Sequence, residues 1–155
     1  MLQSKSIAIL GAGTMGQAIL GGLLAHGHPR RRLFATTRTQ AAALALARER
    51  GVRAGTDNVA AARGADVVVV CLKPMNVLPV CRHLREAGAL KRGALVLSIA
   101  AGVKTEAIAE TLGGSVPIIR AMPNTPCAIG RGMTAISRGP HASDTHVALA
   151  LKLFA

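Results

Sequence analysis

Residues 6–16 of the chain read Ser-Ile-Ala-Ile-Leu-Gly-Ala-Gly-Thr-Met-Gly, and this stretch decides which fold the sequence predicts. Its first five residues form a short apolar run closed by glycine, which is typical of a buried strand. Gly11, Gly13 and Gly16 then follow with GxGxxG spacing and open a segment, 14–26, whose apolar residues recur at helical spacing. Such a turn suits a dinucleotide, because its glycines permit a tight turn, close approach of a pyrophosphate and close helix packing, and the helix start offers N–H donors. The alternative is a tight glycine turn that binds no ligand.

Strand and helix patterns alternate along the rest of the chain. Further strands are expected at 33–37, 52–54, 65–72, 94–99 and 116–122, with another candidate at 133–137. Further helices are expected at 40–50, 57–64, 75–90 and 105–112, with a last helix beginning at Ser143. This alternation requires parallel strands joined by right-handed crossovers. The sequence therefore predicts an α/β fold of Rossmann type, a doubly wound and mainly parallel sheet flanked by helices, with residues 1–140 as the dinucleotide-binding domain.

The composition narrows the class of partner. The 155 residues include 19 Lys and Arg against 7 Asp and Glu, and the resulting net charge of +12 favours an anionic ligand. Phe34 and Phe154 are the only aromatic residues, so the chain has no platform for stacked bases and no nucleic-acid partner is expected. The stretch 7–25 is apolar, but its five glycines and Gln17 argue against a targeting or membrane segment. We therefore expect a cytoplasmic protein without a membrane partner.

Other kinds of site find no support in the sequence. The chain has three cysteines, an odd number, and none of them has CxxC spacing: Cys71, Cys81 and Cys127. This pattern indicates a reducing compartment. Cys71 is expected to be a core residue. The five histidines form no HExxH motif, so no metal site is predicted. The chain also lacks a GxSxG motif, and a hydrolase nucleophile is not expected.

The end of the second expected strand indicates which dinucleotide binds. NAD sites usually place Asp or Glu about 20 residues after the glycines, whereas this chain has Ala-Thr-Thr-Arg-Thr at 35–39. The Arg38 guanidinium can pair with a 2′-phosphate, and the Thr37 hydroxyl can donate a hydrogen bond to it. NADP(H) is therefore favoured over NAD(H), although Arg38 has the alternative of being an exposed loop residue. Lys73-Pro74 follows the valine-rich strand at the same edge of the sheet, where ligands of open α/β folds collect. Lys73 could therefore contact the ligand, and the alternative is that it is a solvated lysine at a strand end.

Together these motifs resemble the N-terminal half of the pyrroline-5-carboxylate reductase family. The resemblance runs from about residue 6 to the end of the chain and is carried by Leu-Gly-Ala-Gly-Thr-Met-Gly at 10–16, Leu-Lys-Pro at 72–74, Ser-Ile-Ala-Ala-Gly-Val at 98–103 and Ile-Arg-Ala-Met-Pro-Asn-Thr-Pro at 119–126. The first segment occurs in many dehydrogenases, and the last is more particular to this family. Thr14 departs from the Asn or Gln of many members. The resemblance implies a Rossmann domain that holds NADPH, or NADH in some members, for the reduction of 1-pyrroline-5-carboxylate to L-proline, the last step of proline biosynthesis.

The resemblance also implies where each site residue would act, and it identifies no catalytic general acid. The pyrophosphate would lie against Gly11, Ala12, Gly13, Thr14 and Met15. The 2′ position of the adenosine would lie at Thr37 and Arg38, with Asn58 near the adenosine. The ribose and nicotinamide end would be lined by Cys71, Leu72, Lys73, Pro74, Ala100, Ala101 and Gly102. The floor beside the reacting ring would be formed by Met122, Pro123, Asn124 and Thr125.

A second domain is also implied by the resemblance. Members of the family continue into an all-helical domain that dimerises and supplies most substrate contacts, so residues 141–155 would begin a helix leading to it, and full-length members form homo-oligomers. Since the cofactor itself donates the hydride, a cofactor domain alone would present half of the pocket. Two alternatives stay open: a stand-alone NADP-binding module without catalysis, and a related reductase, such as a hydroxy acid dehydrogenase or a deazaflavin-dependent NADP reductase.

Overall fold

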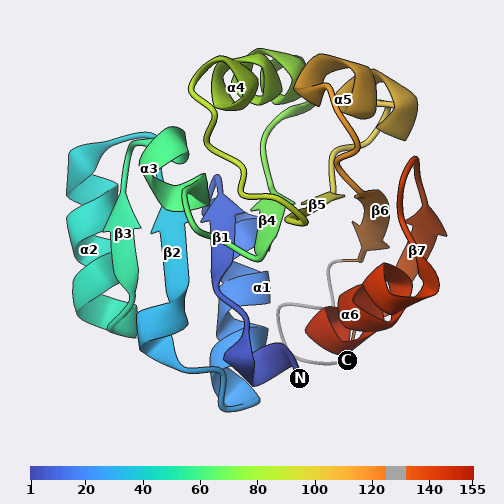
Figure 1. Cartoon of the computed structure of the whole chain (residues 1–155). Coiled ribbons are helices and arrows are strands. Elements are labelled where there is room, and N and C mark those ends of the chain that lie inside the picture. The colour runs from blue at the N-terminus through green and yellow to red at the C-terminus, as the bar shows by residue number, and fades with distance from the viewer. Residues whose placement is uncertain (125–131) are drawn as a thin grey trace.

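The computed structural model describes residues 1–124 and 132–155, which form a seven-stranded sheet with helices on both faces (Figure 1). The strands are β1 (Ile7–Leu10), β2 (Leu33–Thr36), β3 (Arg53–Gly55), β4 (Val67–Val70), β5 (Leu95–Ser98), β6 (Ile118–Pro123) and β7 (Thr134–Arg138). The helices are α1 (Thr14–Ala25), α2 (Gln40–Arg50), α3 (Asn58–Ala62), α4 (Pro74–Glu86), α5 (Thr105–Leu112) and α6 (Asp144–Phe154), with short 3-10 turns η1 (Leu2–Ser4) and η2 (Arg30–Arg32).

The strand order shows that the sheet is doubly wound. Its order is β3-β2-β1-β4-β5-β6-β7, so the chain winds outward from β1 to β3 and then returns to the other side of β1. Ile7 of β1 lies opposite Leu33 of β2 on one side and opposite Val67 of β4 on the other. The first six strands are parallel, and β7 runs antiparallel to β6. The predicted Rossmann-type fold is therefore confirmed.

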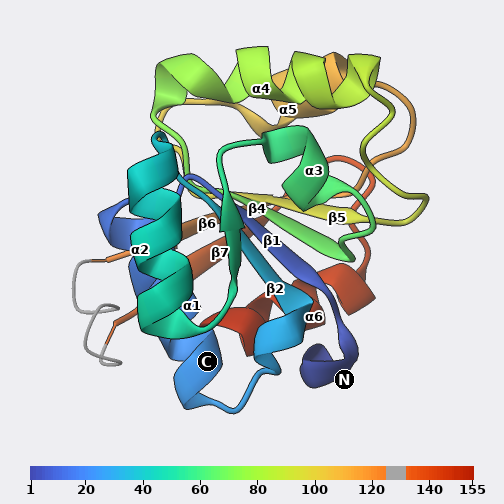
Figure 2. The ribbon, with the colours of Figure 1, turned by 90° about the vertical axis from the view of Figure 1, so that its left-hand side faces the viewer.

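The valine run of β4 explains why two helical layers form. Val67 and Val69 face one apolar core and Val68 and Val70 face the other, because successive side chains of a strand point to opposite faces. One core is closed by side chains of α1, α2 and α6, including Ile19, Leu20, Leu23, Leu46, Ala150 and Leu153. The other is closed by side chains of α3, α4 and α5, including Ala61, Ala62, Val77, Cys81, Leu84, Ile108 and Leu112. Figure 2 shows α4 and α5 above the sheet and α1 and α6 below it.

Most observed elements begin and end within about two residues of their predicted bounds, but α4 ends at Glu86, well before the predicted end at 90. The strand expected to end at residue 122 extends one residue further, because Pro123 is the last residue of β6 and lies opposite Thr134 of β7. Antiparallel pairing with β7 keeps the backbone extended through the proline. The expected strand at 133–137 is confirmed as β7, shifted by one residue.

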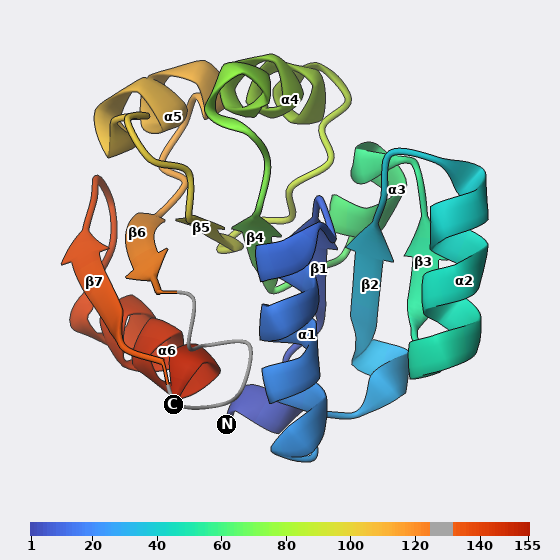
Figure 3. The same ribbon diagram turned by 180° about the vertical axis from the view of Figure 1, so that it is seen from behind.

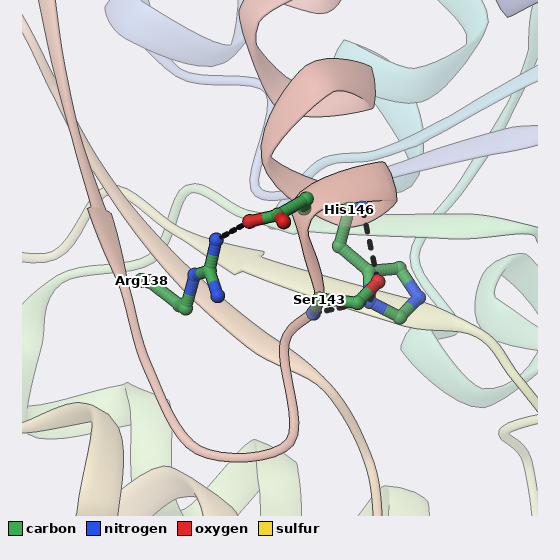
Figure 4. Close-up of polar contacts among 4 residues, drawn as sticks. Arg138, Ser143 and His146 are labelled. Atoms are coloured by element: carbon green, nitrogen blue, oxygen red, sulfur yellow. Dashed lines mark hydrogen bonds and ion pairs between the residues drawn. The ribbon is translucent and has the colours of Figure 1, made fainter.

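The start of α6 is set by its cap (Figure 4). The Ser143 hydroxyl accepts a hydrogen bond from the His146 amide, and the Ser143 amide donates to Nδ1 of His146 at 3.0 Å, so the two residues form a capping box. Arg138, at the end of β7, pairs with the Asp144 carboxylate. The helix then places Ala150 and Leu153 in the core beside α1. Figure 3 shows α6 and α1 on the same side of the sheet.

Polar contacts at the amino ends of the strands tie neighbouring strands together. Asp66 accepts a hydrogen bond from the Ser6 amide at 2.7 Å and forms an ion pair with Nζ of Lys91 at 2.5 Å. Partial burial opposes ionisation of Asp66, but the bonds from Lys91 and Ser6 and the charges of Lys91 and Lys5 outweigh it and lower its pKa. The carboxylate thus links the segments that enter β1, β4 and β5.

Within the described ranges, no helix is both long and apolar enough to cross a membrane.

His28 is buried in the turn that follows α1. Its Nε2 lies 3.1 Å from the Lys5 carbonyl oxygen, and its Nδ1 is buried with no hydrogen-bond partner among the described residues. Since a carbonyl only accepts, Nε2 carries the proton and Nδ1 is deprotonated. Burial is the main cause that lowers the pKa of His28; Arg32 also lowers it, while the bond to Lys5 opposes the shift. The folded chain therefore favours the neutral imidazole.

Neutral His28 predicts a loss of stability in mild acid. As pH falls below the ordinary histidine pKa of about 6.5, the unfolded chain binds a proton that the folded chain resists, so the free energy of unfolding should decrease. Urea denaturation across the range from about pH 7.5 to about pH 5 should show a shallower decrease for His28→Gln than for the wild type. His26→Gln, at an exposed position nearby, is the matched control. Equal pH dependence in the wild type and His28→Gln would contradict the interpretation.

Candidate functional site

The predicted site residues lie along one edge of the sheet, because the carboxyl ends of all six parallel strands meet there. The segment 11–15 follows β1, Thr37 and Arg38 follow β2, and Asn58 begins the helix after β3. The loops after β4, β5 and β6 hold Cys71, Leu72, Lys73, Ala100, Ala101, Gly102 and Asn124. Pro74 begins α4, and Met122 and Pro123 end β6. Thr125 lies outside the described residues. The structure thus brings the described candidates to the edge that holds ligands in open α/β folds.

Two loops meet at the point where the winding reverses, between β1 and β4. Gly11 has φ of +91°, and a Cβ atom there would lie 2.7 Å from the Cys71 carbonyl oxygen and 2.9 Å from Cδ2 of Leu72. A Cβ atom on Gly16 would lie 2.5 Å from the Gly11 carbonyl oxygen. Real Cβ atoms do not approach backbone this closely, so both positions require glycine for the packing of the protein itself.

Gly13 differs from its two neighbours in the motif. It is exposed, and outside its own turn no described atom lies within 4 Å of the position that a Cβ would take. It is also the N-cap of α1, where no side chain caps the helix and the first turn has no acidic residue. The first N–H groups of α1 are therefore available to an anion. The open space above Gly13 and these donors fit a dinucleotide pyrophosphate.

A groove begins at the same helix start. It has a volume of about 610 Å³ and is lined by Gly13, Thr14, Gln17, Ala18, Gly21 and Arg50. The side chain of Gln17 donates to the Ala12 carbonyl oxygen at 3.1 Å, which ties the first turn of α1 to the glycine loop. The groove thus extends from the predicted phosphate loop along the outer side of α1.

Thr36 joins the phosphate loop to the adenosine side of the site, and the sequence analysis did not single it out. It is the last residue of β2 and is 2% exposed. Its hydroxyl oxygen accepts from the Gly11 amide at 3.0 Å, and its proton goes to Oδ1 of Asn58 at 2.7 Å. The Ala12 amide donates to the Thr36 carbonyl oxygen at 2.6 Å. The one available signal in the sequence was a hydroxyl at the end of a buried apolar strand.

Thr37 and Arg38 follow at the end of β2. The Thr37 hydroxyl was expected to donate a hydrogen bond to the 2′-phosphate. In this structure it donates instead to the Thr39 carbonyl oxygen at 2.9 Å, so only its lone pairs are available to a ligand. Arg38 is exposed, and no hydrogen bond or ion pair joins it to another described residue. Its guanidinium is therefore available to an anionic group at this edge.

The loop after β4 lies against the glycine turn. Burial raises the pKa of the Cys71 thiol to about 12, so it stays protonated and acts as an apolar core group, as expected. The Cys71 amide donates to the Leu10 carbonyl oxygen at 2.8 Å. Lys73 and Pro74 are exposed at the start of α4, and no side chain caps that helix. This part of the site presents backbone and a cation to solvent.

The loops after β5 and β6 complete the edge. The Ala100 amide donates to Oγ of the buried Ser98 at 3.3 Å, whereas Ala101 and Gly102 are exposed. Oδ1 of Asn124 accepts from the Met133 amide at 2.9 Å and thereby ties the end of β6 to the start of β7. Met122, on β6, is 51% exposed. The structure thus leaves apolar and backbone surface at the end of the site where the substrate floor was expected.

A glycine turn at the winding reversal of a doubly wound sheet, with unpaired helix N–H groups and an arginine after β2, defines a dinucleotide-binding domain of the Rossmann class. Comparison with known proteins assigns the domain more narrowly. The chain belongs to the family of NADP oxidoreductases described as coenzyme F420-dependent, whose family model matches residues 6–102.

The similar proteins bear the name that the sequence motifs predicted. The chain is 37% identical over 152 residues to a pyrroline-5-carboxylate reductase of Vibrio alginolyticus, covering 98% of this chain and 55% of the relative. A solved pyrroline-5-carboxylate reductase of Coxiella burnetii aligns with a TM-score of 0.90 and 33% identity over 97% of this chain and 55% of that one. A Plasmodium falciparum pyrroline carboxylate reductase with NADP bound has the same fold, with a TM-score of 0.83 at 22% identity over 98% of this chain and 55% of that one. The resemblance inferred from the motifs is thereby confirmed, and the chain spans about half the length of the curated relatives it matches.

The contrast between Gly13 and Gly16 predicts opposite effects of the same substitution. Gly16→Ala should lower the free energy of unfolding by about 1–3 kcal/mol, because its methyl group overlaps the Gly11 carbonyl. Gly13→Ala should lower stability by less than about 1 kcal/mol, the cost of alanine at an N-cap, but weaken dinucleotide binding, because its methyl group enters only the space above the loop. Urea denaturation and calorimetric titration with NADPH measure the two effects. Equal loss of stability, or unchanged binding by Gly13→Ala, would contradict this view of the loop.

Proposed function

We propose that this chain is the cofactor-binding half of an NADP(H)-dependent pyrroline-5-carboxylate reductase, which reduces the C=N bond of 1-pyrroline-5-carboxylate to give L-proline in the last step of proline biosynthesis. The observation that carries the proposal is the similarity to pyrroline-5-carboxylate reductases over 152 residues, nearly the whole chain. The glycine turn and the uncapped start of α1 support it, because they offer the backbone donors that a dinucleotide requires.

The choice of NADP(H) over NAD(H) rests on the charge at the end of β2. No carboxylate occurs at 35–39, while Arg38 is exposed and unpaired among the described residues. A guanidinium there favours a 2′-phosphate, whereas a ribose diol is usually bound by an acidic side chain. The name of the Plasmodium falciparum structure, which has NADP bound, adds support. NAD(H) is the alternative cofactor.

When bound, the nicotinamide cofactor supplies the hydride, so the chain's own residues bind and orient. The segment 11–15 would hold the pyrophosphate against the N-terminus of α1. The loops at 71–74 and 100–102 would fix the ribose and the nicotinamide end at the carboxyl ends of β4 and β5. Met122, Pro123 and Asn124 would form the floor on which the imine ring rests. Orienting the ring relative to the hydride donor is the main contribution that such a surface makes to the rate.

A following helical domain would close the other side of the pocket. We propose that it supplies the contacts to the substrate carboxylate and ring and forms the homo-oligomer, with residues 141–155 leading into it from the dinucleotide-binding domain of 1–140. Neither nucleic acid nor a membrane is a partner under this proposal, and the enzyme acts in the cytoplasm.

Two other functions use the same dinucleotide site. The family model covers residues 6–102 alone, which a deazaflavin-dependent NADP reductase or another dehydrogenase would also match. The similarity to pyrroline-5-carboxylate reductases extends over 152 residues and therefore favours that substrate. A binding module without catalysis would hold NADP(H) and form no product, so the activity measurement below separates it from the enzyme.

Replacing Arg38 tests the cofactor choice. Arg38→Ala should weaken NADPH binding by about 1.5–3 kcal/mol, or about ten- to a hundredfold, because a charged hydrogen bond to the 2′-phosphate is lost. NADH binding should change little. Arg92→Ala removes an equal charge from an exposed position before β5, at the opposite edge, and controls for the net charge of +12. Equal weakening of NADPH and NADH by Arg38→Ala would show that this guanidinium does not contact the 2′-phosphate.

Measuring L-proline formation tests the reaction itself. The 155-residue chain and the same chain extended through its downstream reading frame are each supplied with 1-pyrroline-5-carboxylate and NADPH. We expect both forms to bind NADPH and only the extended form to produce L-proline, because it has both sides of the pocket. An extended form that binds NADPH but yields no L-proline would refute the reductase assignment. Turnover by the 155-residue chain would refute the half-pocket interpretation.

A further inference from the structure

The hydroxyl of Thr36 is the centre of a hydrogen-bond relay between two parts of the candidate site. Thr36 is 2% exposed at the end of β2, beneath the edge that the cofactor would cover. Its oxygen lies 3.0 Å from the Gly11 amide nitrogen and 2.7 Å from Oδ1 of Asn58. Gly11 and Asn58 are 47 positions apart in the sequence, and both form a hydrogen bond to this one hydroxyl.

The direction of the relay follows from counting protons. The Gly11 amide can only donate, so the Thr36 oxygen accepts from it and has one proton of its own to give. Oδ1 of Asn58 is the acceptor at 2.7 Å. The reverse amide orientation would place Nδ2 against the hydroxyl and leave the buried Thr36 proton without this acceptor, which is costly inside a protein. The relay therefore fixes the Asn58 amide with its oxygen inward.

The Nδ2 group of Asn58 consequently faces away from Thr36. Asn58 is half-buried at the first turn of α3, and no described residue accepts a hydrogen bond from Nδ2. One oxygen of the neighbouring Asp57 carboxylate, Oδ1, caps α3 by accepting from the Val59 and Ala60 amides at 2.9 and 3.2 Å. The adenosine side of the site thus combines donors from Asn58 and Arg38, and the segment 35–39 contains no carboxylate.

We propose that Thr36 is a positioning residue that holds Asn58 as a hydrogen-bond donor toward the ribose 2′-phosphate and couples this contact to the phosphate loop. The proposal rests on the proposed NADP(H) site and deepens it. Thr36 itself touches no ligand and acts through Asn58 and Gly11. A phosphate accepts hydrogen bonds and can therefore use the donors of Asn58 and Arg38 together, whereas a ribose diol is usually bound by an acidic side chain, which 35–39 lacks.

A double-mutant cycle on the 155-residue chain tests the coupling. Thr36→Val keeps the side-chain shape and removes the hydroxyl, and Asn58→Ala removes the amide. Each single variant should weaken NADPH binding about tenfold, and the double variant should be no weaker than either single variant, because both break one relay. Thr36→Ser should bind within about threefold of the wild type, since it restores the hydroxyl. Losses that multiply in the double variant would overturn the proposal, because a purely structural role for Thr36 predicts independent effects.

A second variant tests the donor character without disturbing the fold. Asn58→Asp retains an oxygen for the Thr36 hydroxyl but replaces Nδ2 by a carboxylate oxygen. Its midpoint of thermal unfolding should stay near that of the wild type, while NADPH binding falls at least tenfold and NADH binding is retained or strengthened. An unchanged ratio of NADPH to NADH affinity would overturn the proposal.

The control variant and the wild type separate this inference from the proposed function. Thr111→Val removes a comparable hydroxyl, which donates to the Ala107 carbonyl oxygen at 2.8 Å within α5, and should leave both affinities unchanged. Failure of the wild type to bind either nucleotide would refute the proposed function. Binding of NADPH by the wild type with equal binding by Thr36→Val would refute the positioning role alone.

Discussion

The close approach of Gly11 to the Cys71 carbonyl is the constraint on which the rest of the structure depends. A side chain on Gly11 would prevent the loops after β1 and β4 from meeting where the winding reverses. Because they meet, the Gly11 amide reaches the Thr36 hydroxyl, and α1 begins directly above the edge of the sheet. The same contact therefore sets the placement of the start of α1 and the geometry of the site. The contacts of Gly11 thus belong both to the packing of the fold and to the candidate binding surface.

Helix caps differ between the centre and the periphery of the sheet. The helices that follow β1, β4 and β5 begin without a side-chain cap, whereas Thr39, Asp57 and Ser143 cap α2, α3 and α6. A side-chain cap typically contributes about 1 kcal/mol, so the central helices forgo this stabilisation. Their N–H groups lie at the edge where strands end and ligands collect. For α1, with its open glycine, this arrangement suits an anion more than a protein side chain.

The sequence predicted those features that depend on near neighbours along the chain. The valine run of β4 and the glycine spacing after β1 were enough to predict a sheet covered on both faces and the edge that holds the site. Pro123 was missed because its conformation depends on pairing with β7, a segment outside its immediate sequence. Thr36 was missed for the same reason, since its importance arises from Gly11 and Asn58 and not from its neighbours in β2. Side-chain hydrogen bonds between distant segments are invisible to a pattern of apolar periodicity.

The common direction of six strands has an evolutionary consequence. Their amino ends carry ties of the protein to itself, such as Asp66 with Lys91 and His28 with the Lys5 carbonyl, while the candidate site occupies the opposite edge. Substitutions that change ligand preference at one edge need not disturb the ties at the other, and mutations distant from one another usually have additive effects. Stabilising changes can accumulate at the amino edge and offset the cost of new specificities at the carboxyl edge. A parallel sheet with this division tolerates divergence of cofactor and substrate while its scaffold persists.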